Sequence, residues 1–179
     1  MKRILTLFLV IGMVLSLGAQ SQINASFTQS KFIKASGKKI ESKGTVLYQS
    51  PETLKMNYTQ PAGDYFIIEG NTIKLNMNGK KSTVDVTKNA TMKVQKNTLL
   101  NCIKGNYKQV ATDNDAECSV KEIGSNRVVT ITAKKAAARG YSKITVTYRK
   151  SDNMVIDMLL EEFNGNTTHY TFSNISVKK

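Results

Sequence analysis

The sequence of 179 residues contains one histidine, two cysteines, two prolines and no tryptophan. So few histidines and cysteines leave little from which to build a metal centre or a histidine-activated nucleophile. The single histidine, His169, alternates with Thr167 and Thr171 in a strand-like segment, which favours a solvent-facing position over a role as general base. Gly-rich phosphate loops and the Gly-x-Ser-x-Gly motif are also absent. The sequence therefore predicts a protein that is not an enzyme and uses no metal or other cofactor.

Length and composition predict one domain with a sizeable hydrophobic core. Hydrophobic residues make up 40% of the chain and charged residues 22%, which is too apolar for a disordered chain. The sequence shows no linker, internal repeat or low-complexity stretch that would divide it. Beyond an N-terminal leader, residues 20–179 are therefore expected to form a single domain.

The chain is strongly basic, with 26 Lys and Arg against 13 Asp and Glu and a formal net charge of +13. Such a charge suits nucleic acid, anionic lipid or an acidic partner, and the total alone selects none of them. The lysine doublets at 38–39, 80–81 and 134–135 fall at expected turns without interleaved aromatic residues, which argues against nucleic acid. Two interpretations remain: lysines that protect turns and strand edges, or attraction to anionic membrane surfaces.

The N-terminus has the pattern of a secretory signal peptide. Basic residues at 2–3 precede an apolar run over residues 4–17, and small residues follow at 18–19. An uncleaved transmembrane anchor is the alternative, but the run is shorter than the roughly 20 residues that span a bilayer. We therefore expect residues 1–19 to be removed on export, which lowers the net charge by two, from +13 to +11.

Export permits a disulfide between the only two cysteines, Cys102 and Cys118. A bridge across the intervening 15 residues would contribute on the order of 3 kcal/mol. The alternative is two unpaired thiols that pack as small hydrophobic groups. Because exported proteins seldom leave two thiols free, we expect the bridge.

Most of the chain after residue 20 alternates between apolar and polar residues, with interruptions by Gly, Asn, Ser and Asp, as antiparallel strands do. Strands are expected at residues 23–33, 40–49, 54–58, 65–69, 72–77, 82–86, 116–123, 127–133, 142–149, 154–162 and 167–177. The segment 89–104 instead places its apolar residues on one helical face, and Gly105 follows as a stop. The polar segment 106–114 predicts a loop.

Eleven strands with one clear helix must close or nearly close a sheet, since long open sheets leave exposed edges. A small barrel fills its interior with side chains, whereas a partly open barrel lines a cavity for an apolar ligand. The sequence leaves both possibilities open, with the helix either packed on the core or covering a cavity. The candidate lining residues are Leu47, Leu54, Met56, Tyr58, Ile68, Met92, Leu99, Leu100, Ile103, Ile144, Val146, Met158 and Tyr170.

Residues 50–61, Ser-Pro-Glu-Thr-Leu-Lys-Met-Asn-Tyr-Thr-Gln-Pro, resemble a segment of the LolA-like periplasmic lipoprotein carriers. In that family a proline is followed by spaced aromatic or aliphatic positions and then by Thr/Ser-x-Pro. Residues 25–29 before this segment and 66–73 after it resemble the family context, and residues 167–175 resemble its closing strand. The resemblance spans nearly all of the chain after the leader.

The resemblance implies an unclosed, strongly curved antiparallel β-barrel of about eleven strands, with one or two helices over its open side. It implies a periplasmic carrier that binds the acyl chains of lipoproteins or other lipids and moves them from the inner to the outer membrane. The implied partners are an inner-membrane release complex and an outer-membrane acceptor. We expect a monomer without a nucleic acid partner.

Two positions depart from the family pattern. The arginine before the family's proline, which is associated with lid contacts and cargo release, is Ser50 here, and one aromatic position is Met56. The segment after the leader also begins with a strand, where typical carriers have a lid helix. An alternative function is therefore an exported lipid-sensing or protein-interaction domain of the same fold, with a regulatory or structural role.

Overall fold

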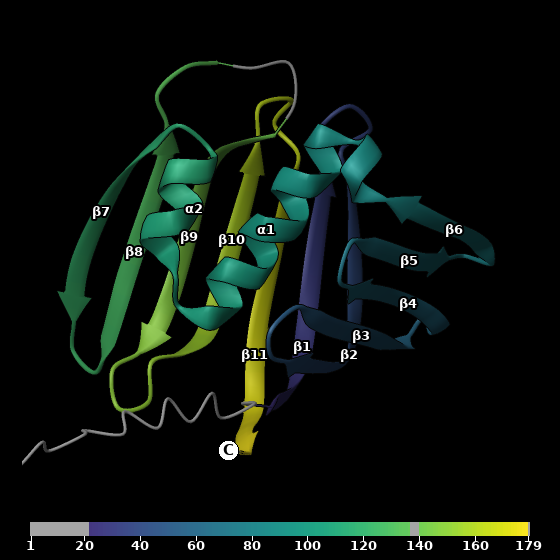
Figure 1. The fold of residues 1–179 in the computed structure, drawn as a ribbon, viewed down its shortest axis with the longest axis horizontal. Coiled ribbons are helices and arrows are strands. Elements are labelled where there is room, and N and C mark those ends of the chain that lie inside the picture. The colour runs from purple at the N-terminus through teal and green to yellow at the C-terminus, as the bar shows by residue number, and fades with distance from the viewer. Residues whose placement is uncertain (1–21, 137–139, 179) are drawn as a thin grey trace, which may run out of the picture.

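The computed structural model describes residues 22–136 and 140–178 (Figure 1). The predicted signal peptide, residues 1–19, lies outside the described residues. The strands are β1 (Gln22–Ile33), β2 (Lys38–Gln49), β3 (Thr53–Gln60), β4 (Ala62–Glu69), β5 (Thr72–Met77), β6 (Lys80–Asp85), β7 (Ala116–Ile123), β8 (Asn126–Ala133), β9 (Tyr141–Arg149), β10 (Met154–Glu162) and β11 (Thr167–Lys178). The helices are the 3-10 turn η1 (Val86–Lys88), α1 (Ala90–Lys104) and α2 (Tyr107–Asp113).

All the strands belong to one antiparallel sheet in the order β6-β5-β4-β3-β2-β1-β11-β10-β9-β8-β7. The two ends of the described chain meet at its centre, where Gln22 pairs with Lys178. The sheet does not close, because β6 and β7 remain unpaired at its edges. Figure 1 shows it curving until β3–β6 run across the direction of β8–β11, with α1 and α2 on its hollow side. This architecture confirms the predicted unclosed barrel.

Alternation of apolar and polar residues produces this sheet. In β3, Leu54, Met56 and Tyr58 are buried on the hollow side while the residues between them are more exposed. The hairpin between β5 and β6 turns at Asn78 and Gly79, whose φ angles of 54° and 76° suit a tight hairpin turn. The predicted strand pattern is confirmed.

Helix α1 begins and ends where the sequence predicts. The Asn89 side chain accepts a hydrogen bond from the Met92 N–H at 3.0 Å, which caps the first turn. Gly105 ends the helix with a left-handed φ of 78°, and its N–H bonds back to helix carbonyls. No helix within the described residues has both the length and the apolar character needed to cross a membrane.

The second helix, α2, corrects the prediction of a loop at residues 106–114. Val110 and Ala111 are buried, and Tyr107, which precedes them by three and four residues, also packs against the core. This spacing is the apolar face of a short helix, but two helical turns among polar residues give a weak pattern. Packing on the sheet, rather than helix propensity, stabilises the segment.

The predicted disulfide is wrong in this structure, in which Cys102 and Cys118 are free thiols. Cys102 lies on the buried side of α1, while Cys118 lies exposed on the edge strand β7. Helix α2 packs against both α1 and β7 and thereby holds the two elements apart. Short separation in sequence therefore does not bring the two sulfurs together.

Gly44 occupies the point where β2 and β3 change register, and a Cβ there would come within 2.1 Å of the Asn57 carbonyl oxygen. We expect Gly44→Ala to lower the free energy of unfolding by about 3 kcal/mol, because one strand must move away. Gly37→Ala is the control: its Cβ meets open space and only its φ of 65° is unfavourable, so it should cost about 1 kcal/mol. Urea unfolding measures both, and equal losses would contradict the close approach.

Thiol labelling without reductant tests the cysteine assignment. At pH 8 the native protein should react at Cys118 alone, because burial raises the pKa of Cys102 from 9.0 to about 12. Both thiols should react in urea, and no reaction there would indicate the disulfide.

Since Cys102 ionises near 9 when unfolded and near 12 when folded, the free energy of unfolding should fall as the pH rises between these values.

Candidate functional site

Helix α1 lies over the hollow side of the sheet, and two cavities lie beneath it. A wider cavity of about 440 Å³ lies beside its first turns, where residues of α1, α2, β8 and β9 line it and Gln95 and Tyr141 border both spaces. Of the two cavities beneath the helix, the larger has a volume of about 190 Å³ and the smaller about 20 Å³. The larger is lined by Gln29, Tyr58, Phe66, Ile73, Met77, Met92, Gln95, Lys96, Thr98, Leu99, Tyr141, Leu160 and Tyr170. The space directly beneath the helix is therefore mostly filled, and its larger cavity is bordered by the first half and the middle of α1.

The wall of the larger cavity is apolar with a few polar groups. Phe66, Ile73 and Met77 come from β4 and β5, and Met92 and Leu99 from the underside of α1. Methionine is flexible and polarisable, so it adapts to ligands of different shape. Such a wall suits an aliphatic chain better than a polar metabolite.

Three tyrosines contribute hydroxyl groups to the same wall. Burial raises the pKa of Tyr58 and of Tyr141 to about 12, and it raises that of Tyr170 as well. The side chain of Gln29 donates a hydrogen bond of 2.8 Å to the Tyr170 hydroxyl. These hydroxyls therefore stay protonated at neutral pH and offer hydrogen bonds without negative charge.

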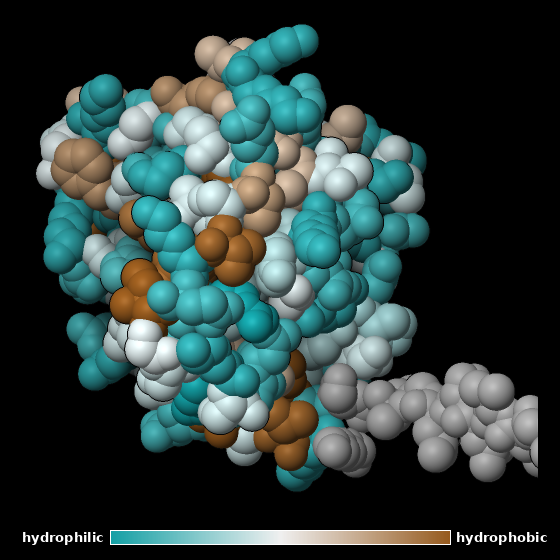
Figure 2. Space-filling view, turned by 90° about the vertical axis from the view of Figure 1, so that its left-hand side faces the viewer, coloured by the Kyte–Doolittle hydropathy of each residue, from teal (hydrophilic) through white to brown (hydrophobic). Residues whose placement is uncertain are grey.

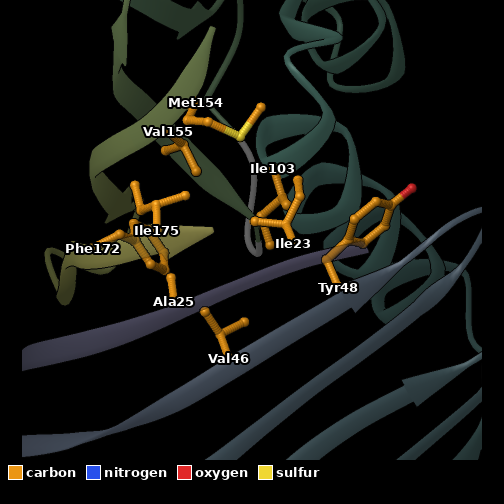
Figure 3. A pocket seen from close by; sticks show the side chains of 9 residues that line it. All are labelled: Ile23, Ala25, Val46, Tyr48, Ile103, Met154, Val155, Phe172 and Ile175. Atoms are coloured by element: carbon orange, nitrogen blue, oxygen red, sulfur yellow. The ribbon is translucent and has the colours of Figure 1, made fainter. Parts of the chain in front are cut away.

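The smaller cavity marks a packed region near the second half of α1 (Figure 3). Ile103 of α1 meets Ile23, Val46 and Val155 from three strands. Its 20 Å³ holds about one water molecule. Figure 3 shows the Tyr48 hydroxyl directed away from the other side chains, where it donates to the Pro51 carbonyl at 3.2 Å. This end of the interior is core rather than binding site.

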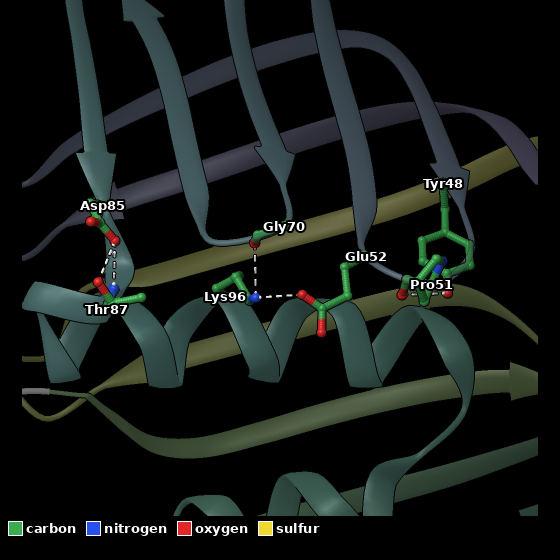
Figure 4. Close-up of polar contacts among 7 residues, drawn as sticks. All are labelled: Tyr48, Pro51, Glu52, Gly70, Asp85, Thr87 and Lys96. Atoms are coloured by element: carbon green, nitrogen blue, oxygen red, sulfur yellow. Dashed lines mark hydrogen bonds and ion pairs between the residues drawn. The ribbon is translucent and has the colours of Figure 1, made fainter.

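A buried lysine joins α1 to the sheet (Figure 4). The Lys96 side chain is only 4% exposed. Its Nζ lies 2.9 Å from Glu52 Oε2 in the β2–β3 turn and donates at 2.9 Å to the Gly70 carbonyl in the β4–β5 turn. One residue of the helix thus holds two turns of the sheet, and it does so at the border of the larger cavity.

Two further polar contacts hold α1. The Asn114 side chain donates to Thr98 Oγ1 at 3.0 Å, and the buried Tyr148 hydroxyl donates to the Cys102 carbonyl at 2.8 Å. Apolar packing by Leu100 and Ile103 is concentrated in the second half of the helix. The first half, by contrast, carries the half-buried Met92 above the cavity, and Leu99 lines the same cavity just beyond the midpoint of the helix.

The structure divides the sequence-predicted site residues into three groups. Tyr58, Met92, Leu99 and Tyr170 line the larger cavity, and Ile103 lines the smaller one. A second group is buried in the packed core without lining either cavity: Leu54, Met56, Ile68, Leu100, Ile144, Val146 and Met158. Leu47 belongs to neither group.

The expected inward orientation of Leu47 is wrong. Its neighbours Val46 and Tyr48 are buried, while Leu47 is half-exposed and pairs with Lys55 of β3. Because side chains alternate along a strand, Leu47 lies on the outer face. In the sequence Thr-Val-Leu-Tyr, residues on both faces of the strand are compatible with burial. The pattern alone therefore did not show which face points inward.

Sequence reasoning missed the polar members of the cavity wall. Gln29 lies on the same face of β1 as the buried Phe27, which is the only signal of its position. Lys96 carries no signal, because a lysine in an amphipathic helix is normally solvent-exposed. Among the residues that the structure describes, no group of three or more His, Cys, Asp or Glu is arranged to hold a metal ion.

The chain is similar to proteins of a known family. Residues 19–179 match the family model described as "Outer membrane lipoprotein carrier protein LolA". A search of curated proteins finds no match. The family match confirms the resemblance seen in the sequence.

Solved structures of similar fold come from several bacteria. A LolA superfamily protein of Nitrosomonas europaea is 9% identical, with 90% of this chain and 88% of that chain covered and a TM-score of 0.41. An outer membrane lipoprotein-sorting protein domain of Vibrio parahaemolyticus is 9% identical, with 89% and 86% covered and a TM-score of 0.41. The lipoprotein LppX of Mycobacterium tuberculosis is 12% identical, with 88% and 87% covered and a TM-score of 0.40.

Substitution of Lys96 tests the connection between α1 and the sheet. Lys96→Met keeps most of the side-chain volume but removes both polar contacts, so we expect the free energy of unfolding to fall by about 1–3 kcal/mol. Hydrogen exchange of the α1 amides should accelerate by more than that of β9. Lys93→Met, at an exposed position of the same helix, is the control and should leave both unchanged. Equal effects of the two variants would contradict the role of Lys96.

Proposed function

Because the chain belongs to the LolA family of outer membrane lipoprotein carrier proteins, we propose that it carries lipoprotein acyl chains or other lipids between the inner and outer membranes. The larger cavity beneath the first half of α1 is the observation that supports this proposal most directly. We propose that the ligand enters there and that α1 acts as the lid.

The size of the cavity implies that the lid moves. Its 190 Å³ is below the roughly 300–1,000 Å³ of ordinary ligand pockets, so we infer that α1 moves outward to admit a long acyl chain. Burying an acyl chain gains roughly 0.8 kcal/mol per CH₂, which amounts to roughly 10 kcal/mol for a dozen methylenes. This gain exceeds the 1–3 kcal/mol of the Lys96 contacts, so the ligand itself can drive the opening.

The distribution of contacts along α1 suggests how the helix moves. The second half is held by buried Leu100, Cys102 and Ile103, whereas the first half covers the cavity with half-buried side chains. We infer that the first half moves while the second half remains seated on the sheet. Lys96 lies between the two halves, so its release from Glu52 and Gly70 accompanies loading.

Localisation completes the proposal. Residues 1–19 act as a signal peptide, and residues 20–179 form the single lipid-binding domain in the periplasm. An inner-membrane release complex loads the carrier and an outer-membrane acceptor unloads it. No covalent chemistry is required, because the work consists of shielding an apolar chain from water.

Binding of a fluorescent palmitoylated peptide tests the site. Leu99→Gln places a polar group in the cavity wall, and we expect it to weaken binding by about tenfold, since a buried leucine contributes roughly 1.5–3 kcal/mol. Leu47→Gln is the matched control, also half-exposed but on the outer face, and should bind like the unchanged protein. Equal binding by both variants would exclude this cavity as the site.

The protein for this test should be isolated gently from the exported fraction, with its N-terminus determined by mass spectrometry. Lipid or acylated protein that co-purifies supports the carrier function. Transfer of the peptide between donor and acceptor vesicles then separates a carrier from a lipid sensor of the same fold, because a sensor binds without accelerating transfer.

A further inference from the structure

The hairpin between β1 and β2 ends in a segment that combines positive charge with exposed apolar side chains. This segment, residues 31–41, is called the β1–β2 tip. It contains four lysines and one glutamate, a local excess of three positive charges. Phe32 is 38% exposed and Ile40 is 36% exposed, although both are large hydrophobic residues. They lie on opposite faces of the hairpin, because Phe32 pairs with Lys39 and Ile40 with Lys31.

Most of the charge of the tip is not neutralised. Lys39 pairs with Glu41 at 2.7 Å, and both side chains are more than half exposed. Lys31, Lys34 and Lys38 form no ion pair within residues 22–136 and 140–178. Three ammonium groups and two apolar side chains thus share the end of one hairpin.

The tip is already folded. The N–H groups of Ser36 and Gly37 donate to the carbonyls of Ile33 and Lys34 at 3.2 and 3.3 Å, which closes the turn. The Lys34 N–H donates to the Asn166 side chain at 3.1 Å, which joins the tip to the β10–β11 turn. A surface that binds in this conformation pays little conformational entropy on docking.

The tip also lies close to the lipid site in the sequence and in space. Gln29 lines the larger cavity three residues before Phe32 on the same strand, a distance of about 10 Å. Figure 1 shows the β1–β2 connection at the same end of the molecule as the beginning of α1. Whatever binds the tip therefore faces the moving half of the lid.

We propose that the β1–β2 tip docks the protein on an anionic lipid bilayer, with Phe32 and Ile40 in the interfacial region and the lysines against the headgroups. Apolar side chains flanked by lysines are the combination that binds such surfaces, since each lysine near an anionic membrane contributes attraction and each buried apolar group adds to it. Docking directs the cavity toward the membrane from which, or to which, an acyl chain passes.

No other part of the described surface combines these features to the same degree. The remaining exposed large hydrophobic residues are Val120 and Ile123 on β7 and Val177 on β11. In Figure 2, which faces the β7 side, hydrophobic side chains lie in separate groups among hydrophilic ones. The lysine pair at 80–81 lies beside no exposed large hydrophobic residue of its own hairpin.

Sedimentation with lipid vesicles tests the docking without any cargo. The exported protein should bind phosphatidylcholine vesicles that contain about 30% phosphatidylglycerol, and it should bind pure phosphatidylcholine much less. Replacing Lys31, Lys34 and Lys38 together by Gln should weaken binding about a hundredfold, since each lysine contributes about fivefold. Salt at about 1 M, where the Debye length is about 3 Å, should release most of the protein.

Two matched controls separate the tip from the charge of the whole protein. Replacing Lys80, Lys81 and Lys121 by Gln removes the same charge from exposed positions elsewhere and should weaken binding only slightly. Phe32→Ser should weaken binding by about tenfold. Ile123→Ser changes an even more exposed residue, at 59%, and should have no effect.

The outcomes distinguish this proposal from the carrier function. If the two lysine triple variants lose binding equally, or if the unchanged protein ignores anionic vesicles, the docking proposal is wrong, and the tip would then serve an acidic protein or only keep the hairpin soluble. The tip variants should still bind the palmitoylated peptide in detergent-free solution. Loss of peptide binding in Leu99→Gln without loss of vesicle binding confirms that the two surfaces act separately.

Discussion

Helix α1 covers an apolar face that the curved sheet cannot cover by itself. Eleven strands bend far enough to bring both halves of the sheet near each other, but β6 and β7 stay unpaired and the hollow side stays open. The helix fills that side with Leu100, Cys102 and Ile103 at one end and leaves a 190 Å³ cavity at the other. The same packing therefore both stabilises the fold and shapes the cavity. In the proposed function, a ligand competes with the helix for this apolar surface.

The polar contacts of Lys96 hold α1 on the sheet and therefore oppose displacement of the helix. A lysine buried to 96% is costly unless it is paired, and here a carboxylate and a carbonyl from two different turns satisfy it. The carboxylate, Glu52, lies two residues after Ser50, the position where the resembling family has an arginine. In this chain the cation is on the helix and the acceptors are on the sheet. Because Glu52 is about half exposed, the pair separates at moderate cost, which is compatible with the proposed movement of α1.

The sequence was sufficient for the strands and for α1, but not for the short helix α2 or for the details of the site. Strict alternation in Leu54-Lys55-Met56-Asn57-Tyr58 predicts strand and face together, and one apolar helical face followed by the Gly105 stop predicts α1. Around Leu47, four successive residues can each be buried, so the sequence does not show which of them face inward. The predicted inward orientation of Leu47 was therefore wrong. The disulfide was predicted because exported proteins seldom leave two thiols free, and this argument takes no account of α2 between α1 and β7. The positions of the Lys96 and Gln29 side chains depend on contacts with residues more than 40 positions away in the sequence. Local sequence patterns do not indicate such contacts.

The central pairing of β1 with β11 has a consequence for the order in which the chain folds. The strands β1–β6 and β7–β11 can each form from neighbouring hairpins, but the two halves join only when the last strand reaches the first, about 150 residues away in sequence. A chain synthesised from its N-terminus thus keeps the hollow face of its first half unprotected until the C-terminal strand has been made. Truncation or stalling near the end of synthesis therefore leaves this apolar face open to association with other chains.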